Sequence, residues 1–133
     1  MDPSRLKSIP LFKRFPDEEL REIATFADEA SVPEGKHLVD EGDYSYEFMA
    51  IEEGSAEVQR DGQHVADLGP GDYFGEMGLL EKDRRSATVI AKTPMRIITL
   101  TGWDLKRMEK SMPQAVEQIR ATMEQRRPPG GAQ

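Results

Sequence analysis

The residues with the clearest potential for chemistry lie in one stretch, residues 72–89. The stretch opens as a glycine-rich turn, in which Gly75 and Gly78 let the backbone come close to a ligand. If a short helix follows this turn, its free N–H groups carry partial positive charge and suit a phosphate. Arg85 adds a planar, permanently charged group that fits phosphate oxygens, and Ser86 adds a hydroxyl and a backbone N–H. The spacing therefore predicts a small anion site.

Glu76 limits the kind of ligand that this site can take, because it lies between the two glycines. A carboxylate beside a phosphate is repulsive unless it accepts a hydrogen bond from a group that lies between them. A sugar hydroxyl would fill this role. The inferred ligand carries a singly charged phosphate and a nearby ribose hydroxyl.

The elements that must position this stretch are mostly strands. From residue 30 the apolar pattern has a period of two, and turn residues recur every few positions, most clearly at Asp61-Gly62. Many short antiparallel strands at regular spacing favour a sandwich or a jelly roll. We expect strands near residues 36–39, 47–51, 56–60, 64–68, 87–91 and 95–101.

Helical spacing of apolar residues flanks the strands on both sides. One helix is expected from Pro16-Asp17 to about Asp28, and two more at residues 103–110 and 113–126. Between the last two, Ser111 and Gln114 have the spacing of a capping box. Residues 1–8 are expected to form a flexible arm, and the Pro- and Gly-rich residues 128–133 a disordered tail.

Residues 74–80 and 85–91 resemble the two halves of the phosphate-binding cassette of the cyclic nucleotide-binding domain family. This family occurs in the catabolite activator protein, in regulatory subunits of protein kinase A and in cyclic-nucleotide-gated channels. Residues 41–43, 48–54 and 69–72 resemble the family's strand and turn signatures in the same order. The resemblance covers roughly residues 9–127, and it implies an α+β, mainly β domain. Its expected parts are an antiparallel eight-stranded jelly-roll β-barrel that carries the cassette, an N-terminal helical segment and two C-terminal helices.

The resemblance also implies a role for individual residues. Arg85 and Ser86 would contact the cyclic phosphate, and Glu76 would accept the ribose 2′-hydroxyl. Other interpretations stay open. Arg85 could be a surface arginine in an ion pair, and Glu76 could be an acidic turn residue or the ion-pair partner of Arg85. Ser86 could be only a polar residue at the start of a strand. The full set of expected ligand-binding residues is Gly75, Glu76, Met77, Gly78, Arg85, Ser86 and Ala87.

The end of the last expected helix is a candidate for a cap on the base. Family members fold this helix over the pocket, and here it ends in Gln125, Arg126 and Arg127. An arginine can stack on a purine face. The alternative is a basic helix end that complements the helix dipole.

Composition excludes several function classes. With 133 residues and a net charge of −7, the chain allows one domain and disfavours nucleic acid or anionic lipid as a partner. There is no cysteine, and His37 and His64 lie far apart without carboxylates at metal-ligand spacing, so neither a metal site nor another cofactor is expected. No apolar run resembles a signal peptide or a membrane span, so a cytoplasmic location is the expectation.

Taken with the resemblance, these observations predict a non-enzymatic sensor that binds a 3′,5′-cyclic nucleotide, with cAMP favoured over cGMP. Its C-terminal helices would reposition on binding and act on an effector protein or domain outside the chain. A homodimer through the last helix is a further expectation. The alternatives are a ligand-free interaction module with the same fold, a regulatory fragment of a larger cAMP-controlled protein, and a metal-dependent jelly-roll enzyme. A transcription factor would need a helix-turn-helix that the residues after 126 are too few to form.

Overall fold

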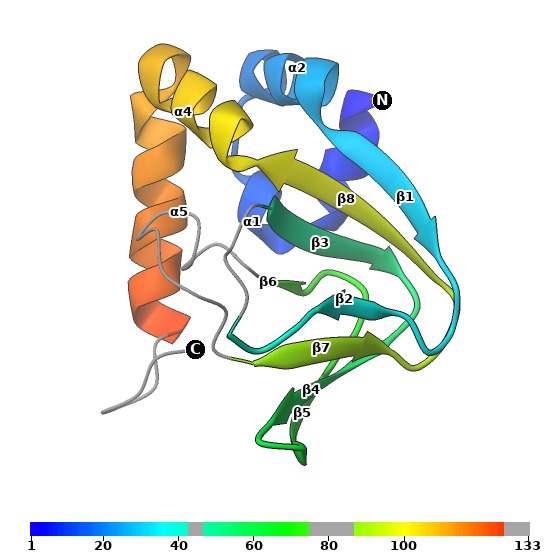
Figure 1. Cartoon of the computed structure of the whole chain (residues 1–133). Coiled ribbons are helices and arrows are strands. Elements are labelled where there is room, and N and C mark those ends of the chain that lie inside the picture. The colour runs from blue at the N-terminus through cyan, green and yellow to red at the C-terminus, as the bar shows by residue number, and fades with distance from the viewer. Residues whose placement is uncertain (43–46, 75–86, 127–133) are drawn as a thin grey trace.

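The structure is a computed structural model that describes residues 1–42, 47–74 and 87–126, with the backbone alone for residues 119–120 and 122–126. Strands form one half of it and helices lie on one side of them (Figure 1). The described strands are β1 (Asp28–Val32), β2 (His37–Val39), β3 (Glu47–Glu53), β4 (Ala56–Arg60), β5 (Gln63–Leu68), β6 (Tyr73–Phe74), β7 (Thr88–Ala91) and β8 (Met95–Thr101).

The strands form two four-stranded sheets, with the orders β1-β8-β3-β6 and β2-β7-β4-β5. All pairs are antiparallel. The partners are nested along the chain: β4 pairs with β5, β3 with β6, β2 with β7 and β1 with β8. A long hairpin folded over on itself gives this order, and it is the arrangement of a jelly roll. The expected fold class is therefore confirmed.

The turn between β4 and β5 has the geometry that the sequence indicates. Asp61 has φ of 54° and Gly62 has φ of 77°, and the flanking residues Arg60 and Gln63 are paired. Positive φ at both central residues is the requirement of a type I′ turn, whose twist matches the strands that it joins. The Asp-Gly pair thus sets the register of this hairpin.

Two strands, β1 and β6, lie outside the expected ranges. β1 is an edge strand that exposes its first four residues and buries Val32, so it lacks an alternating apolar pattern. It also begins at Asp28, because the preceding helix ends at Phe26. β6 has only two residues, both buried, and pairs with β3. These segments are strands because they pair with a neighbouring strand. The local sequence does not encode that pairing.

The helices are η1 (Pro3–Ser8, a 3₁₀-helix), α1 (Pro10–Lys13), α2 (Asp17–Phe26), α4 (Gly102–Ser111) and α5 (Pro113–Arg126). The last two lie within one residue of their expected bounds. The capping box, however, lies at the start of α4: the Thr101 hydroxyl accepts from the Asp104 N–H, and the Asp104 carboxylate accepts from the Thr101 N–H. Ser111 is instead the last residue of α4, and its hydroxyl lies 2.5 Å from the Glu22 carboxylate on α2. The capping box expected at Ser111 was therefore wrong.

The flexible arm expected at residues 1–8 is also corrected by the structure. Leu6 and Ile9 are fully buried, and Arg5 donates two hydrogen bonds to the Glu52 carboxylate on β3. Apolar residues recur every third position from Leu6 through Ile9 and Phe12 to Phe15. All four side chains are buried, although only Leu6 lies in the 3₁₀-helix and Phe12 lies in the separate helix α1. The N-terminal segment is part of the folded domain.

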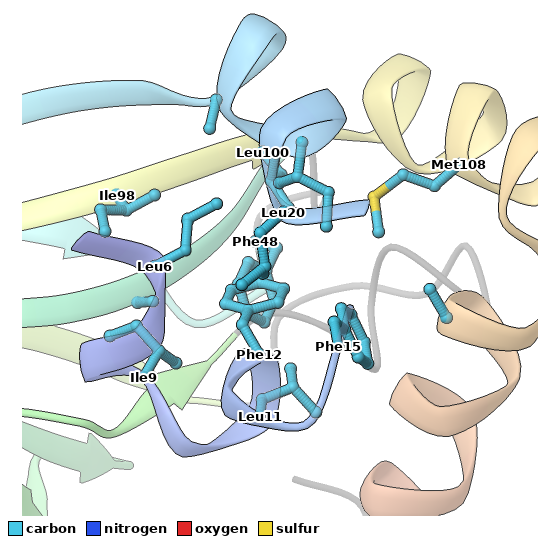
Figure 2. Close-up of a cluster of buried hydrophobic side chains, with 14 of the residues drawn as sticks. Leu6, Ile9, Leu11, Phe12, Phe15, Leu20, Phe48, Ile98, Leu100 and Met108 are labelled. Atoms are coloured by element: carbon cyan, nitrogen blue, oxygen red, sulfur yellow. The ribbon is translucent and has the colours of Figure 1, made fainter. Parts of the chain in front are cut away.

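Two apolar clusters hold the fold together. The first lies between the helices and one face of the β1-β8-β3-β6 sheet, where the rings of Phe12 and Phe48 meet edge to face at 5.9 Å (Figure 2). The second lies between the two sheets and includes Met49, Ile51 and Val89. Because successive residues of a strand face opposite sides, β3 supplies Phe48 to the first cluster and Met49 to the second. The sheet is thus buried on both faces.

Candidate functional site

Most of the residues expected to bind the ligand lie outside the described part of the chain. This holds for Gly75, Glu76, Met77, Gly78, Arg85 and Ser86. Ala87 is described: it is half-buried and directly precedes β7. Of the candidate base caps, Gln125 and Arg126 form the end of α5 with only their backbone described, and Arg127 lies outside the described residues.

The two ends of the expected cassette are held by different sheets. Phe74 is the last residue of β6, which pairs with β3 in the first sheet. Thr88 begins β7, which lies between β2 and β4 in the second sheet. Phe74 is buried in the cluster between the sheets, together with Val89 of β7. Residues 75–86 therefore start and finish at positions that the jelly-roll core holds in place.

A polar network supports the second of these anchors. The Glu41 N–H donates to the Thr88 hydroxyl at 2.9 Å, and the Glu41 carboxylate accepts from the Asp61 N–H at 3.0 Å. Three parts of the chain thus meet beside the start of β7: the turn after β2, the β4–β5 hairpin and the end of the cassette. Gly42, with φ of 88°, provides the left-handed conformation that this turn needs. The Glu41-Gly42 signature therefore positions the residues next to the cassette.

Thr99, which was not among the residues expected from the sequence, is a buried polar residue in the same sheet as Phe74. It pairs with Met49 on β3, and Met49 pairs with Phe74 on β6, so the three residues form one row across the sheet. Directly opposed residues place their side chains on the same face. Thr99 is 8% exposed and is the one polar residue in the buried set of the described chain. The available signal was a threonine at the alternate position after Met95 and Ile97 on β8.

The two histidines have carboxylate partners on the surface. His37 Nδ1 lies 2.6 Å from the Asp40 carboxylate, and His64 Nδ1 lies 2.8 Å from the Glu57 carboxylate. The hydrogen bond with His64, and a second from Gln59, hold the pKa of Glu57 below its ordinary value. In residues 1–42, 47–74 and 87–126, no three His, Asp or Glu side chains gather in a group that could hold a metal ion. Both histidines therefore form polar pairs with carboxylates at the surface.

None of the described helices is long and apolar enough to span a membrane.

Comparison with known proteins places this fold and this cassette in one family. The family described as the cyclic nucleotide-binding domain matches residues 29–111, from β1 to the end of α4. A cyclic nucleotide-gated potassium channel of Rhizobium etli is 35% identical over 120 residues, which is 90% of this chain and 34% of the channel. A regulatory subunit of cAMP-dependent protein kinase from Yarrowia lipolytica is 37% identical over 97 residues, which is 71% of this chain and 26% of the subunit.

A solved structure agrees with these sequence relatives. The catabolite activator protein of Thermus thermophilus superposes with a TM-score of 0.80 at 28% identity, over 88% of this chain and 57% of that protein. This chain spans about a third or less of the two sequence relatives, 34% and 26% of their lengths. The match covers more than half of the chain and includes every described strand except the first residue of β1. The chain therefore belongs to the cyclic nucleotide-binding domain family, whose domain is a regulatory module.

Proposed function

We propose that this domain binds a 3′,5′-cyclic nucleotide reversibly as a regulatory sensor, with cAMP preferred over cGMP. The observation that carries the proposal is the presence of Gly75-Glu76 and Arg85-Ser86 at cassette spacing inside the family match. Arg85 would bind the cyclic phosphate through its guanidinium, and Glu76 would accept a hydrogen bond from the ribose 2′-hydroxyl. Backbone N–H groups of Met77, Gly78 and Ala87 would add contacts to the phosphate.

The preference for cAMP rests on two observations. The residue after the expected phosphate-binding arginine is Ser86. The resemblance associates a serine at this position with the bacterial cAMP receptor and a threonine with cGMP-binding kinases. The Yarrowia relative is named as a subunit of a cAMP-dependent kinase, which favours the same ligand.

Signalling would pass through the helices after β8. The N-terminal half of α5 packs into the same cluster as α4 and the N-terminal segment, with Ala115 and Val116 each 2% exposed. Met112, at the junction of α4 and α5, is in the same cluster. Nucleotide binding can shift these helices from one arrangement to another only if the nucleotide has a higher affinity for the second arrangement than for the first. A nucleotide that draws the cassette inward would supply that difference through β6, because Phe74 lies in the cluster between the sheets and its neighbour Tyr73 lies in the cluster that the helices share.

The relatives suggest what the target of the signal would be. The relatives are several times longer than the matched region, and in them this domain is joined to other parts. An effector protein or effector domain is therefore the expected partner, and a homodimer through α5 is a second arrangement. The alternative function is a ligand-free interaction module, and a measurement of nucleotide binding distinguishes it from a sensor.

The test is calorimetric titration of the folded, nucleotide-free protein with cAMP and with cGMP. We expect one-to-one binding, tighter for cAMP, and a large loss in Arg85→Ala. Removing one member of a charge pair that is buried on binding costs about 2 to 5 kcal/mol, or roughly thirty-fold to several-thousand-fold in Kd.

Arg84→Ala is the matched control, since it removes the same charge from the neighbouring position. It should bind cAMP with nearly unchanged affinity. Equal affinity of Arg85→Ala and the unmodified protein would overturn the site assignment. Absence of heat with both nucleotides would overturn the sensor and favour the ligand-free module.

A further inference from the structure

The most exposed large apolar side chain in the described chain is Trp103, at the start of α4. It is 76% exposed, whereas the next such residue, Val65, is 45% exposed. Its indole contacts the Lys106 ammonium, 5.2 Å from the ring centre, and this cation–π contact leaves most of the ring in water. Tryptophan is among the residues that contribute most to binding at protein interfaces. An indole left this open is therefore a candidate anchor for a partner.

Trp103 belongs to a continuous stripe on α4. An α-helix advances about 100° per residue, so positions 103, 106, 107 and 110 fall within an arc of about 100°. The burial pattern agrees: these four positions are exposed, and Leu105 and Met108 on the opposite side are buried. We call this stripe the α4 outer face. Its members are Trp103, Lys106, Arg107 and Lys110.

The α4 outer face carries three positive charges in a chain whose net charge is −7. None of the three cations forms an ion pair with another described residue. The acidic residues of the same helix lie beside the stripe, and Asp104 is engaged in the cap with Thr101 while Glu109 has a partner of its own. The helix dipole explains a cation in the last turn, such as Lys110, but neither Lys106 nor an exposed indole near the first turn.

We propose that the α4 outer face docks an acidic protein segment that carries an apolar or aromatic side chain. The three cations would attract the carboxylates, and Trp103 would pack on the apolar side chain once water is excluded. Charge complementarity of this kind sets partner choice and association rate. A short acidic segment senses the local charge, because fields are screened within about 8 Å at physiological salt. An anionic membrane would also meet the rest of a chain whose net charge is −7, so it is the less favoured occupant.

The inference does not depend on nucleotide binding, because every residue that carries it lies on α4. It concerns the output side of the domain, since α4 leads directly into α5. Docking and nucleotide binding can therefore be measured separately, and a negative result for one proposal does not refute the other.

Trp103 is the single tryptophan of the chain, so its fluorescence reports on this face directly. The experiment titrates the full chain with a panel of synthetic peptides that contain no Trp. Each peptide is rich in Glu and Asp and carries one Phe, one Leu or another aromatic residue. The comparison panels are acidic peptides without an apolar residue, Lys-rich peptides with one, and phosphatidylserine vesicles. We expect a saturable blue shift with members of the first panel. The shift should weaken as salt is raised.

The decisive variant is the triple reversal Lys106→Glu, Arg107→Glu and Lys110→Glu. It should weaken binding about three- to 150-fold, because each exposed ion pair that it removes typically contributes about 0.2 to 1 kcal/mol. The matched control reverses Lys13, Arg14 and Lys36, three exposed cations elsewhere that change the net charge equally. Its affinity should be nearly unchanged. Binding of Trp103→Ala, followed by calorimetry, should also be weaker.

Three outcomes would overturn the proposal. One is that no acidic peptide with an apolar residue shifts the fluorescence more than the Lys-rich panel does. Another is that both triple reversals weaken binding equally, since net charge alone would then explain the attraction. The third is that vesicles give the shift and peptides do not, which would assign the face to membranes.

Discussion

Gly54 gives the sharpest test of the packing that holds the two sheets in place. It lies in the turn between β3 and β4 with φ of +93°, a conformation that favours glycine. A Cβ atom there would lie 2.4 Å from the carbonyl oxygen of Pro94 and 2.9 Å from the Cα of Met95. Both are backbone atoms, of the first residue of β8 and of the residue before it, so no side-chain rotation relieves the contact. Gly54→Ala therefore combines a conformational cost with a collision.

The two costs can be estimated separately. A left-handed conformation costs an L-residue about 1 to 2 kcal/mol. Forcing an extra methyl group into a packed site typically costs about 1 to 3 kcal/mol more. Backbone movement would also strain the hydrogen bonds that join these turns, from Lys92 N–H to the Ser55 carbonyl at 2.9 Å and from Ser55 N–H to the Thr93 hydroxyl at 3.0 Å. We expect a loss of about 2 to 5 kcal/mol from a typical total of about 5 to 15 kcal/mol.

The assay is equilibrium unfolding in urea at 25 °C, and Gly35→Ala is the matched control. Gly35 has φ of +88°, and a Cβ atom there would meet nothing within 4 Å. The control should therefore show only the conformational cost, about 1 to 2 kcal/mol. The reasoning would be refuted if the two alanine variants unfolded at the same urea concentration with the same slope.

Further predictions concern the N-terminal segment and the core. The pKa of Glu52 lies below its ordinary value of 4.5, chiefly because Arg5 donates hydrogen bonds to its carboxylate. That stabilisation is present above about pH 4.5 and is lost as the pH falls through the lowered folded pKa. Arg5→Ala should therefore have a lower free energy of unfolding than the unmodified protein at pH 7, and this difference should narrow in urea titrations below pH 4.5. A difference in free energy that stays constant down to acid pH would contradict this. Phe48→Ala removes a ring that is 1% exposed and should cost about 3 to 5 kcal/mol in thermal or urea unfolding, whereas Val65→Ala, at a 45% exposed site, should change stability by less than about 0.5 kcal/mol. Comparable losses in these two variants would show that the Phe12–Phe48 cluster does not dominate the core.

Local patterns in the sequence predicted the elements whose conformation is set by near neighbours. The Asp61-Gly62 turn formed as expected, because its two residues tolerate positive φ. The helices at residues 102–111 and 113–126 matched their periodicity. The capping box was misplaced because Thr101-Asp104 and Ser111-Gln114 have comparable spacing, and contact with Glu22 decides the role of Ser111.

Family resemblance supplied what the local patterns did not. Two strands, β1 and β6, lacked a readable pattern, yet the full jelly roll was expected because of the cassette signature. Glu76 and Arg85, the residues that indicate the class of ligand, were identified from the sequence and remain the main residues of the proposed site. Their assignment stays a prediction, because they lie outside the described residues.

The amino-acid sequence by itself determined the family, the class of ligand to expect and the positions of the turns and C-terminal helices, since these depend on short motifs. Only the tertiary structure decided that Leu6 and Ile9 are core residues, that Thr99 shares a row with Met49 and Phe74, and that Trp103 is left in water. These facts depend on which distant segments come together, and a strand's partners or a helix's buried face cannot be read from the residues next to it. The cassette is therefore visible in the sequence, whereas the anchors on either side of it and the exposure of the proposed docking face are visible only in the fold.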